Sequence, residues 1–144
     1  MSFTKKYRDQ HEELLQMVGK IAPYLQESKV KESAEEISKM LIALTGKLKL
    51  HLAIEDEHLY PLLTKSNDPS VKNMAAQFMK EMGGIAKAYG DYRTKWALPQ
   101  TMKAQPQEFI KDTLAVVKVL QDRISRENNQ LYQIADKADA VKAA

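Results

Sequence analysis

Apolar side chains recur every three or four residues along almost the whole chain, and this spacing constrains the fold more than any other feature. It places them on one face of an α-helix, whereas a half-buried strand would alternate by two. The pattern predicts four helices, over about residues 4–26, 33–62, 69–98 and 106–134. Short connections make sequential helices antiparallel, so the expected fold is all-α, an up-down-up-down four-helix bundle.

Local signals indicate where these helices begin and end. Ser33 and Glu36 have the spacing of a capping box, in which side chains satisfy the first backbone N–H groups of a helix. Asp68 and Pro69 are typical of an N-cap followed by proline at the first helical position. Pro99 is expected to stop the third helix and Pro106 to open the fourth, while Pro23 should kink or thin the last turn of the first.

The composition limits the class of protein. With 144 residues, the chain is expected to form one domain over residues 1–144. It has no cysteine, which excludes disulfides and thiolate chemistry. Its start lacks the apolar run of a signal peptide, and no apolar stretch approaches the roughly 18 residues of a membrane span. We therefore expect a cytoplasmic protein with no membrane partner, and the scattered basic residues disfavour a nucleic-acid partner.

Ionisable residues interrupt the predicted inner faces. His11 lies on the inner face of the first helix, His51 and Glu55 on that of the second, and Arg123 and Glu127 on that of the fourth. A buried carboxylate is costly unless something neutralises it, and two carboxylates that face each other repel. A bound cation removes both costs, and so does a buried arginine.

The ends of the second and fourth helices share a sequence frame at a constant offset of 72 residues, which relates Glu55 to Glu127 and residue 51 to residue 123. The frame is x-x-x-x-Glu-x-x-x-Leu-Tyr. Two helical hairpins that each end in this frame would form a pseudo-two-fold bundle, with the two glutamates facing each other across the core. One turn before the glutamate, the first copy has His51 and the second has Arg123.

All three histidines of the sequence, His11, His51 and His58, lie on predicted inner faces. Residues four apart share a helix face, so the spacing of His51 and Glu55 can direct an imidazole nitrogen and a carboxylate to one metal ion. A single buried histidine is more often a core residue with satisfied hydrogen bonds, but three that converge on a carboxylate favour a set of ligands. His58 could instead hydrogen-bond a tyrosine of the third helix or cap the site.

At these residues the chain resembles the hemerythrin-like (HHE cation-binding) family. The landmarks are His11, then His51-x3-Glu55 followed by Leu59-Tyr60-Pro61, and Glu127 followed by Leu131-Tyr132. The resemblance implies a four-helix bundle that holds two irons bridged by carboxylates, and the family's classical members bind oxygen reversibly. It also implies that His11 and His51 are terminal ligands of one iron and that Glu55 and Glu127 bridge.

Two positions depart from the family pattern. Met82 and Arg123 stand where histidines are expected, and no histidine follows His58. The second iron therefore keeps no histidine ligand, and we expect one mononuclear site for iron or another divalent metal such as Zn, Mn or Co. Oxygen or another small ligand could occupy an open position. Nothing in the sequence supplies a dedicated catalytic base, so a binding protein is favoured over an enzyme.

Arg123 leaves a second function open. A guanidinium stays charged and can bind a carboxylate in bidentate fashion, so Arg123 could replace the metal ion and neutralise Glu127 in a metal-free bundle with a regulatory or partner-binding role. It could instead reach the bundle end and pair at the surface. A diiron oxygen-binding protein is disfavoured by Met82 and Arg123. Tyr60 and Tyr132 are expected to be packing residues.

Overall fold

The computed structural model describes residues 3–143, and the side chains of residues 82, 83 and 138–143 lie outside the described part. Four long helices account for most of it: α1 (Lys5–Ile21), α2 (Glu27–Ile54), α4 (Pro69–Lys95) and α6 (Pro106–Arg126). Shorter elements connect or extend them: the 3₁₀ turn η1 (Ala22–Tyr24), the π-helical turns η2 (Glu55–Leu59) and η3 (Glu127–Leu131), and the helices α3 (Tyr60–Thr64), α5 (Pro99–Ala104) and α7 (Tyr132–Ala143).

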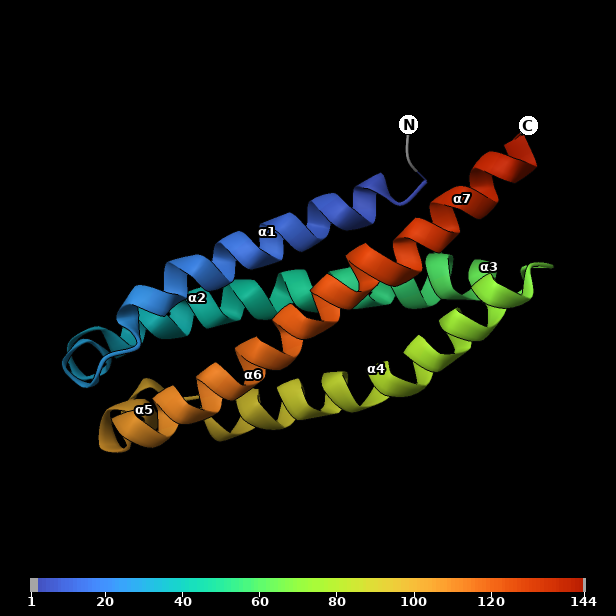
Figure 1. Cartoon of the computed structure of the whole chain (residues 1–144). Coiled ribbons are helices and arrows are strands. Elements are labelled where there is room, and N and C mark those ends of the chain that lie inside the picture. Colours follow the sequence, from blue (N-terminus) through green and yellow to red (C-terminus); the bar gives the residue numbers. More distant parts are fainter. Residues whose placement is uncertain (1–2, 144) are drawn as a thin grey trace.

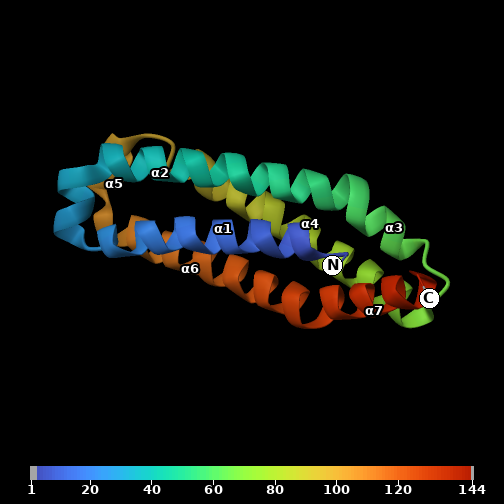
Figure 2. The same ribbon diagram turned by 90° about the horizontal axis from the view of Figure 1, so that it is seen from above.

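The helices run alternately up and down, as Figure 1 shows, and this confirms the expected four-helix bundle. α2 continues through η2 into α3, and α6 continues through η3 into α7, so two long rods each contain a π-helical turn. Both views place α3 and α7 at one end of the bundle and α5 at the other (Figure 1 and Figure 2). Within the described residues, no helix combines the length and apolar character that crossing a bilayer requires.

Some predicted helix ends are correct and others are not. Asp68 caps α4 as expected, because its carboxylate accepts from the backbone N–H of Ser70 at 2.9 Å. The predicted start at Ser33 is wrong, since α2 begins at Glu27. The backbone of Ser33 is non-helical (φ −126°, ψ 28°), as an N-cap requires, but the preceding turn is also helical, so the residue marks a kink. The third helix does not extend to Pro99 as predicted, because α4 ends at Lys95; Pro99 instead opens α5.

Two apolar clusters form the core, and a layer of polar side chains separates them. The larger cluster includes Leu14 of α1 and Leu48 of α2, and the smaller one includes Tyr7 of α1 and Leu59 of η2. His11 falls between Tyr7 and Leu14 on α1, and buried ionisable residues fall between the clusters on α2 and α6 as well. Each fully buried leucine contributes roughly 1.5–3 kcal/mol, so apolar packing on both sides stabilises a layer that is itself costly to bury.

The two π-helical turns occupy equivalent places in the 72-residue repeat. The backbone N–H of Tyr60 bonds the carbonyl of Glu55 in η2, and the N–H of Tyr132 bonds that of Glu127 in η3. Residues five apart differ by about 140° around a regular α-helix. The wider turn reduces that angle and brings each tyrosine toward the face of its glutamate.

The π-helical turn η2 also corrects the inner face that the sequence predicts for the second helix. A π turn holds an extra residue, so every later side chain is rotated relative to an uninterrupted α-helix. Leu59 and Leu63 are buried in place of His58 and Leu62, which are exposed. The prediction that His58 faces the core is therefore wrong.

Candidate metal site

Four side chains meet in the polar layer. His11 comes from α1, His51 from the last turn of α2, Glu55 from η2 and Glu127 from η3. All four are buried, with at most 3% of each residue exposed. One candidate ligand atom from each residue lies within 4.8 Å of those from the other three. Four of the five residues predicted as metal ligands are thus brought together.

An amide side chain orients each imidazole. His51 Nδ1 donates to Gln10 Oε1 at 2.6 Å, and His11 Nδ1 donates to Asn128 Oδ1 at 2.9 Å. An amide oxygen only accepts, so the neutral form of each ring carries its hydrogen on Nδ1 and its lone pair on Nε2. A hydrogen bond at the outer ring nitrogen is the usual support of a metal-binding histidine.

Both Nε2 atoms are directed at carboxylate oxygens. Nε2 of His51 lies 2.5 Å from Oε1 of Glu55, and Nε2 of His11 lies 3.2 Å from Oε1 of Glu127. Within the described residues, His51 Nε2 and Glu55 Oε1 are buried and have no hydrogen-bond partner. Two buried lone pairs that face each other are unfavourable, and a cation or a proton between them relieves the repulsion.

The two tyrosines of the repeat bind the glutamates crosswise. The Tyr60 hydroxyl donates to Glu127 Oε2 at 2.7 Å, and the Tyr132 hydroxyl donates to Glu55 Oε2 at 3.0 Å. Both rings pack in the smaller apolar cluster, as expected. Their role is larger than packing, because each hydroxyl fixes one carboxylate oxygen and leaves the other directed at an imidazole.

Arg123 lies beside this group on the last turn of α6 and is 5% exposed. Its Nη2 is 3.5 Å from Oε2 of Glu127, so the buried pairing is confirmed and the surface alternative is wrong. The contact is not bidentate. Nη2 donates to the Tyr60 hydroxyl at 2.7 Å, Nη1 donates to the carbonyl of Phe78 at 3.2 Å, and the Tyr60 hydroxyl in turn donates to Glu127.

Burial and neighbouring charges separate the acidities of the two glutamates. Burial, followed by the charge of Glu127, raises the pKa of Glu55 well above its ordinary value. Burial also acts to raise the pKa of Glu127, but hydrogen bonds from His11 and Glu55 and the charge of Arg123 lower it to about 2. Burial, with a smaller contribution from His11, lowers the pKa of His51 to about 4, so this imidazole is neutral near pH 7.

Two positions singled out in the sequence do not join the group. The side chain of His58 is 64% exposed on the outer side of η2, with Nε2 3.9 Å from a carboxylate oxygen of Glu57. It bonds neither Tyr89 nor Tyr92, whose hydroxyls bond threonines. His58 is therefore not one of the residues that meet in the polar layer, and the side chain of Met82 lies outside the described part.

Sequence reasoning missed the two orienting amides. Gln10 and Asn128 directly neighbour His11 and Glu127 in the chain, yet each bonds an imidazole from a different helix. No spacing or composition distinguishes them from nearby exposed polar residues. The hydrogen-bonding role of the tyrosines did leave a signal, because the repeat keeps a tyrosine five residues after each glutamate.

The arrangement suits a divalent cation. Two imidazole nitrogens and two carboxylate oxygens are donors that iron, manganese, cobalt and zinc accept. The same side chains also allow a metal-free state, in which protonated Glu55 is neutral and Arg123 forms an ion pair with Glu127. Arg123 differs from a metal ion in that its charge is fixed and its geometry requires hydrogen-bond acceptors.

Comparison with protein families agrees with this geometry. The family model described as Hemerythrin HHE cation binding domain matches residues 2–135, a range that includes both π-helical turns and all four buried candidate ligands. The resemblance drawn from the sequence motifs is thereby confirmed. No curated protein and no solved structure matches the chain.

Proposed function

The chain belongs to the hemerythrin HHE cation-binding family, and we propose that it binds one divalent metal ion between His11, His51, Glu55 and Glu127. Iron is the expected ion, and zinc, manganese and cobalt fit the same donors. The proposal rests chiefly on the convergence of four buried donor groups within 4.8 Å of one another, among which His51 Nε2 and Glu55 Oε1 have no hydrogen-bond partner in the described residues.

Arg123 supports one ion rather than two. Its guanidinium is buried beside Glu127, on the side of the layer where the repeat would place a second histidine. A second cation there would be repelled by a fixed positive charge at close range in a poorly screened interior. The ion would therefore lie on the Oε1 side of Glu127, which faces His11, and the arginine lies on the Oε2 side.

The surrounding residues prepare the site for an ion. Gln10 and Asn128 keep the lone pairs of the imidazoles directed inward, while Tyr132 holds one oxygen of Glu55. The proton on Glu55 leaves when the ion binds, because a ligand must be deprotonated. When bound, the ion supplies a compact positive charge, an open position for a small ligand and, if it is iron, one-electron redox chemistry.

Anaerobic titration of the purified, chelator-treated protein with Fe(II), Mn(II), Co(II) and Zn(II) tests the proposal. We expect saturation at one ion per chain, and we expect His51→Ala to lose that stoichiometric binding because it removes a ligand atom. His58→Ala is the matched control, because it removes an exposed imidazole seven residues away. Absence of saturable binding by any of the four ions, or equal binding by His51→Ala, would contradict it.

The chain of contacts from Arg123 through Tyr60 to Glu127 favours a second candidate, a metal-free bundle with a regulatory or partner-binding role. In that case the protonated Glu55 needs no cation, and the fold is complete without one. Chelator treatment would leave the melting temperature unchanged, and added metal would not raise it. A metal-dependent increase in the melting temperature would instead exclude this candidate, since a ligand that binds only the folded state stabilises it.

A further inference from the structure

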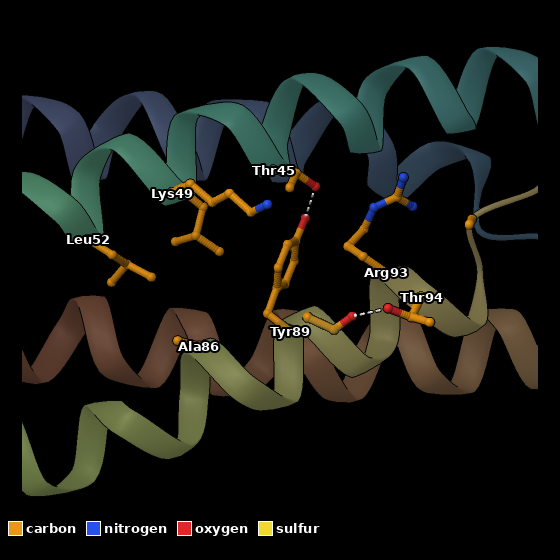
Figure 3. A pocket seen from close by; sticks show the side chains of 10 residues that line it. Thr45, Lys49, Leu52, Ala86, Tyr89, Arg93 and Thr94 are labelled. Atoms are coloured by element: carbon orange, nitrogen blue, oxygen red, sulfur yellow. Dashed lines mark hydrogen bonds between the residues drawn. The ribbon is translucent and has the colours of Figure 1, made fainter.

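A separate cavity of about 550 Å³ opens between α2 and α4, and none of the four candidate metal ligands lines it. Its volume lies in the range of small-molecule sites. Figure 3 shows the ring of Tyr89 rising from α4 to meet Thr45 of α2, with Lys49 and Arg93 on either side of the ring in this view. The remaining lining is apolar or small: Leu48, Leu52, Ala86, Gly90, Thr94 and Ala97.

The two cations of this cavity lack acidic partners. No aspartate or glutamate lines it. Within the described residues, neither Lys49 nor Arg93 forms an ion pair, and Arg93 makes one hydrogen bond, from Nη1 to the carbonyl of Trp96 at 3.3 Å. Two of the four lysines of α4 differ from them, since Lys87 pairs with Asp91 and Lys95 with Asp112. The cavity is therefore positively charged without internal compensation.

The hydroxyl groups of the cavity have no hydrogen left to donate. Thr45 donates to the carbonyl of Leu41 at 2.7 Å, so in its 2.9 Å contact with Tyr89 the tyrosine is the donor. Thr94 donates to the carbonyl of Gly90 at 3.0 Å. Every side-chain donor that remains for a ligand belongs to Lys49 or Arg93. Such a cavity selects a ligand group that is anionic and accepts hydrogen bonds.

From these contacts we propose that the cavity binds a monocarboxylate with an apolar body. Lys49 and Arg93 bind the carboxylate, and the apolar body lies against Leu48, Leu52 and the small residues of α4. Gly90 widens the cavity, since a Cβ added there would meet no atom within 4 Å. The site needs no metal ion, so its test is independent of the metal titration.

Calorimetric titration of the full chain with octanoate tests this site, with octanol and inorganic phosphate as comparison ligands. We expect one saturable octanoate site, and binding of octanol or phosphate weaker by about tenfold or more, since charge-assisted hydrogen bonds and apolar burial both contribute. The double variant Lys49→Met/Arg93→Met should lose at least about tenfold in affinity. Lys80→Met, which removes a cation elsewhere on α4, should leave affinity unchanged.

Gly90→Leu keeps the test informative if the double variant fails to fold. A leucine there improves helix propensity and fills the cavity, so the variant should melt no lower than the parent and lose octanoate binding. The proposal is overturned if the parent shows no saturable octanoate site, if octanol or phosphate binds as tightly, or if Gly90→Leu still binds octanoate.

Discussion

The two halves of the repeat share a π-helical turn, but the pKa values of their buried glutamates shift in opposite directions. Each long rod contains a five-residue π turn that begins at a buried glutamate and ends just before a buried tyrosine. One turn before the glutamate, His51 stands in one half and Arg123 in the other. The pKa of Glu55 is raised, whereas that of Glu127 is lowered to about 2.

This comparison teaches that one structural frame accommodates two ways of neutralising a buried carboxylate. In the half with His51, the neutral imidazole leaves Glu55 dependent on a proton or a metal ion. In the half with Arg123, a permanent cation is built into the chain. The difference between His51 and Arg123 at equivalent positions therefore separates two kinds of site. Glu55 can exchange a proton for a metal ion, whereas the cation beside Glu127 is part of the chain.

The largest effect is expected for Arg123→Ala. Removing one partner of a buried ion pair leaves an uncompensated charge, so the free energy of unfolding of the metal-free protein should fall by about 3–5 kcal/mol. Arg126→Ala is the matched control, because Arg126 lies on the same turn and pairs with Glu81 at the surface; it should cost at most about 1 kcal/mol. If urea denaturation gave equal decreases in the free energy of unfolding for the two variants, the buried pair would contribute no more to stability than the surface pair.

The two glutamates should respond differently to the same substitution. Glu127→Gln removes the carboxylate beside Arg123 and should cost about 3 kcal/mol in the metal-free protein. Glu55→Gln replaces a carboxyl whose raised pKa favours its neutral form, so it should cost less than about 1 kcal/mol. Denaturant unfolding of both variants near pH 7 measures the difference, and a larger loss for Glu55→Gln would reverse the assignment.

The crossed tyrosines provide a smaller asymmetry. Tyr60→Phe removes a hydroxyl that both accepts from Arg123 and donates to Glu127, so it should cost about 1–3 kcal/mol. Tyr132→Phe removes the bond to Glu55 and a 3.2 Å contact with Nε2 of His11; neither involves the permanent charge of an arginine, so the cost should be nearer to about 1 kcal/mol. Thermal unfolding of the two metal-free variants compares them. If Tyr132→Phe proved the more destabilising, Glu55 rather than Glu127 would be the ionised carboxylate.

Loss of an orienting amide should affect metal binding more than folding. Asn128→Ala frees Nδ1 of His11 and should weaken metal affinity about 10–100-fold, the usual effect of removing the hydrogen-bond partner of a ligand. Asn129→Ala is the control, because the adjacent amide is exposed and bonds Ser125. Competition titrations against a metal-binding dye measure the affinities, and equal affinities for the two variants would count against the proposed role of Asn128.

The smallest effect is expected at the outer positions of the repeat. His58 and Gln130 are related by the 72-residue offset, and both are exposed. His58→Ala and Gln130→Ala should each change the free energy of unfolding by no more than about 0.5 kcal/mol and leave metal stoichiometry unchanged. A loss of metal in His58→Ala would mean that η2 can rotate His58 inward.

The bundle and most of the site followed from residue spacing. Four amphipathic segments leave few other folds, and the repeat alone relates Glu55 to Glu127. The sequence could not show whether Ser33 begins a helix or marks a kink within one, because a capping sequence also occurs where two helical stretches join. The prediction for His58 failed because a regular period of 3.6 residues was carried across a π turn.

The hydrogen-bond network could not be predicted from the sequence, because packing between helices decides its partners. Gln10 and Asn128 are polar residues beside ligands, and only the packing of three helices decides which imidazole each one meets. The burial of Arg123 was equally undetermined, since a long side chain can reach either the core or the surface. Its contacts with Phe78 and Tyr60 come from α4 and the start of α3, which sequence spacing does not relate to α6.

Anomalous diffraction from crystals loaded anaerobically with Fe(II), measured at the iron absorption edge, tests the central claim most directly. One ion per chain predicts one anomalous peak, within coordination distance of Nε2 of His11 and His51 and of the carboxylates of Glu55 and Glu127, and no peak in contact with the Arg123 guanidinium. Two peaks would contradict the claim in favour of a dinuclear centre. No peak at full iron loading would contradict it in favour of a metal-free bundle.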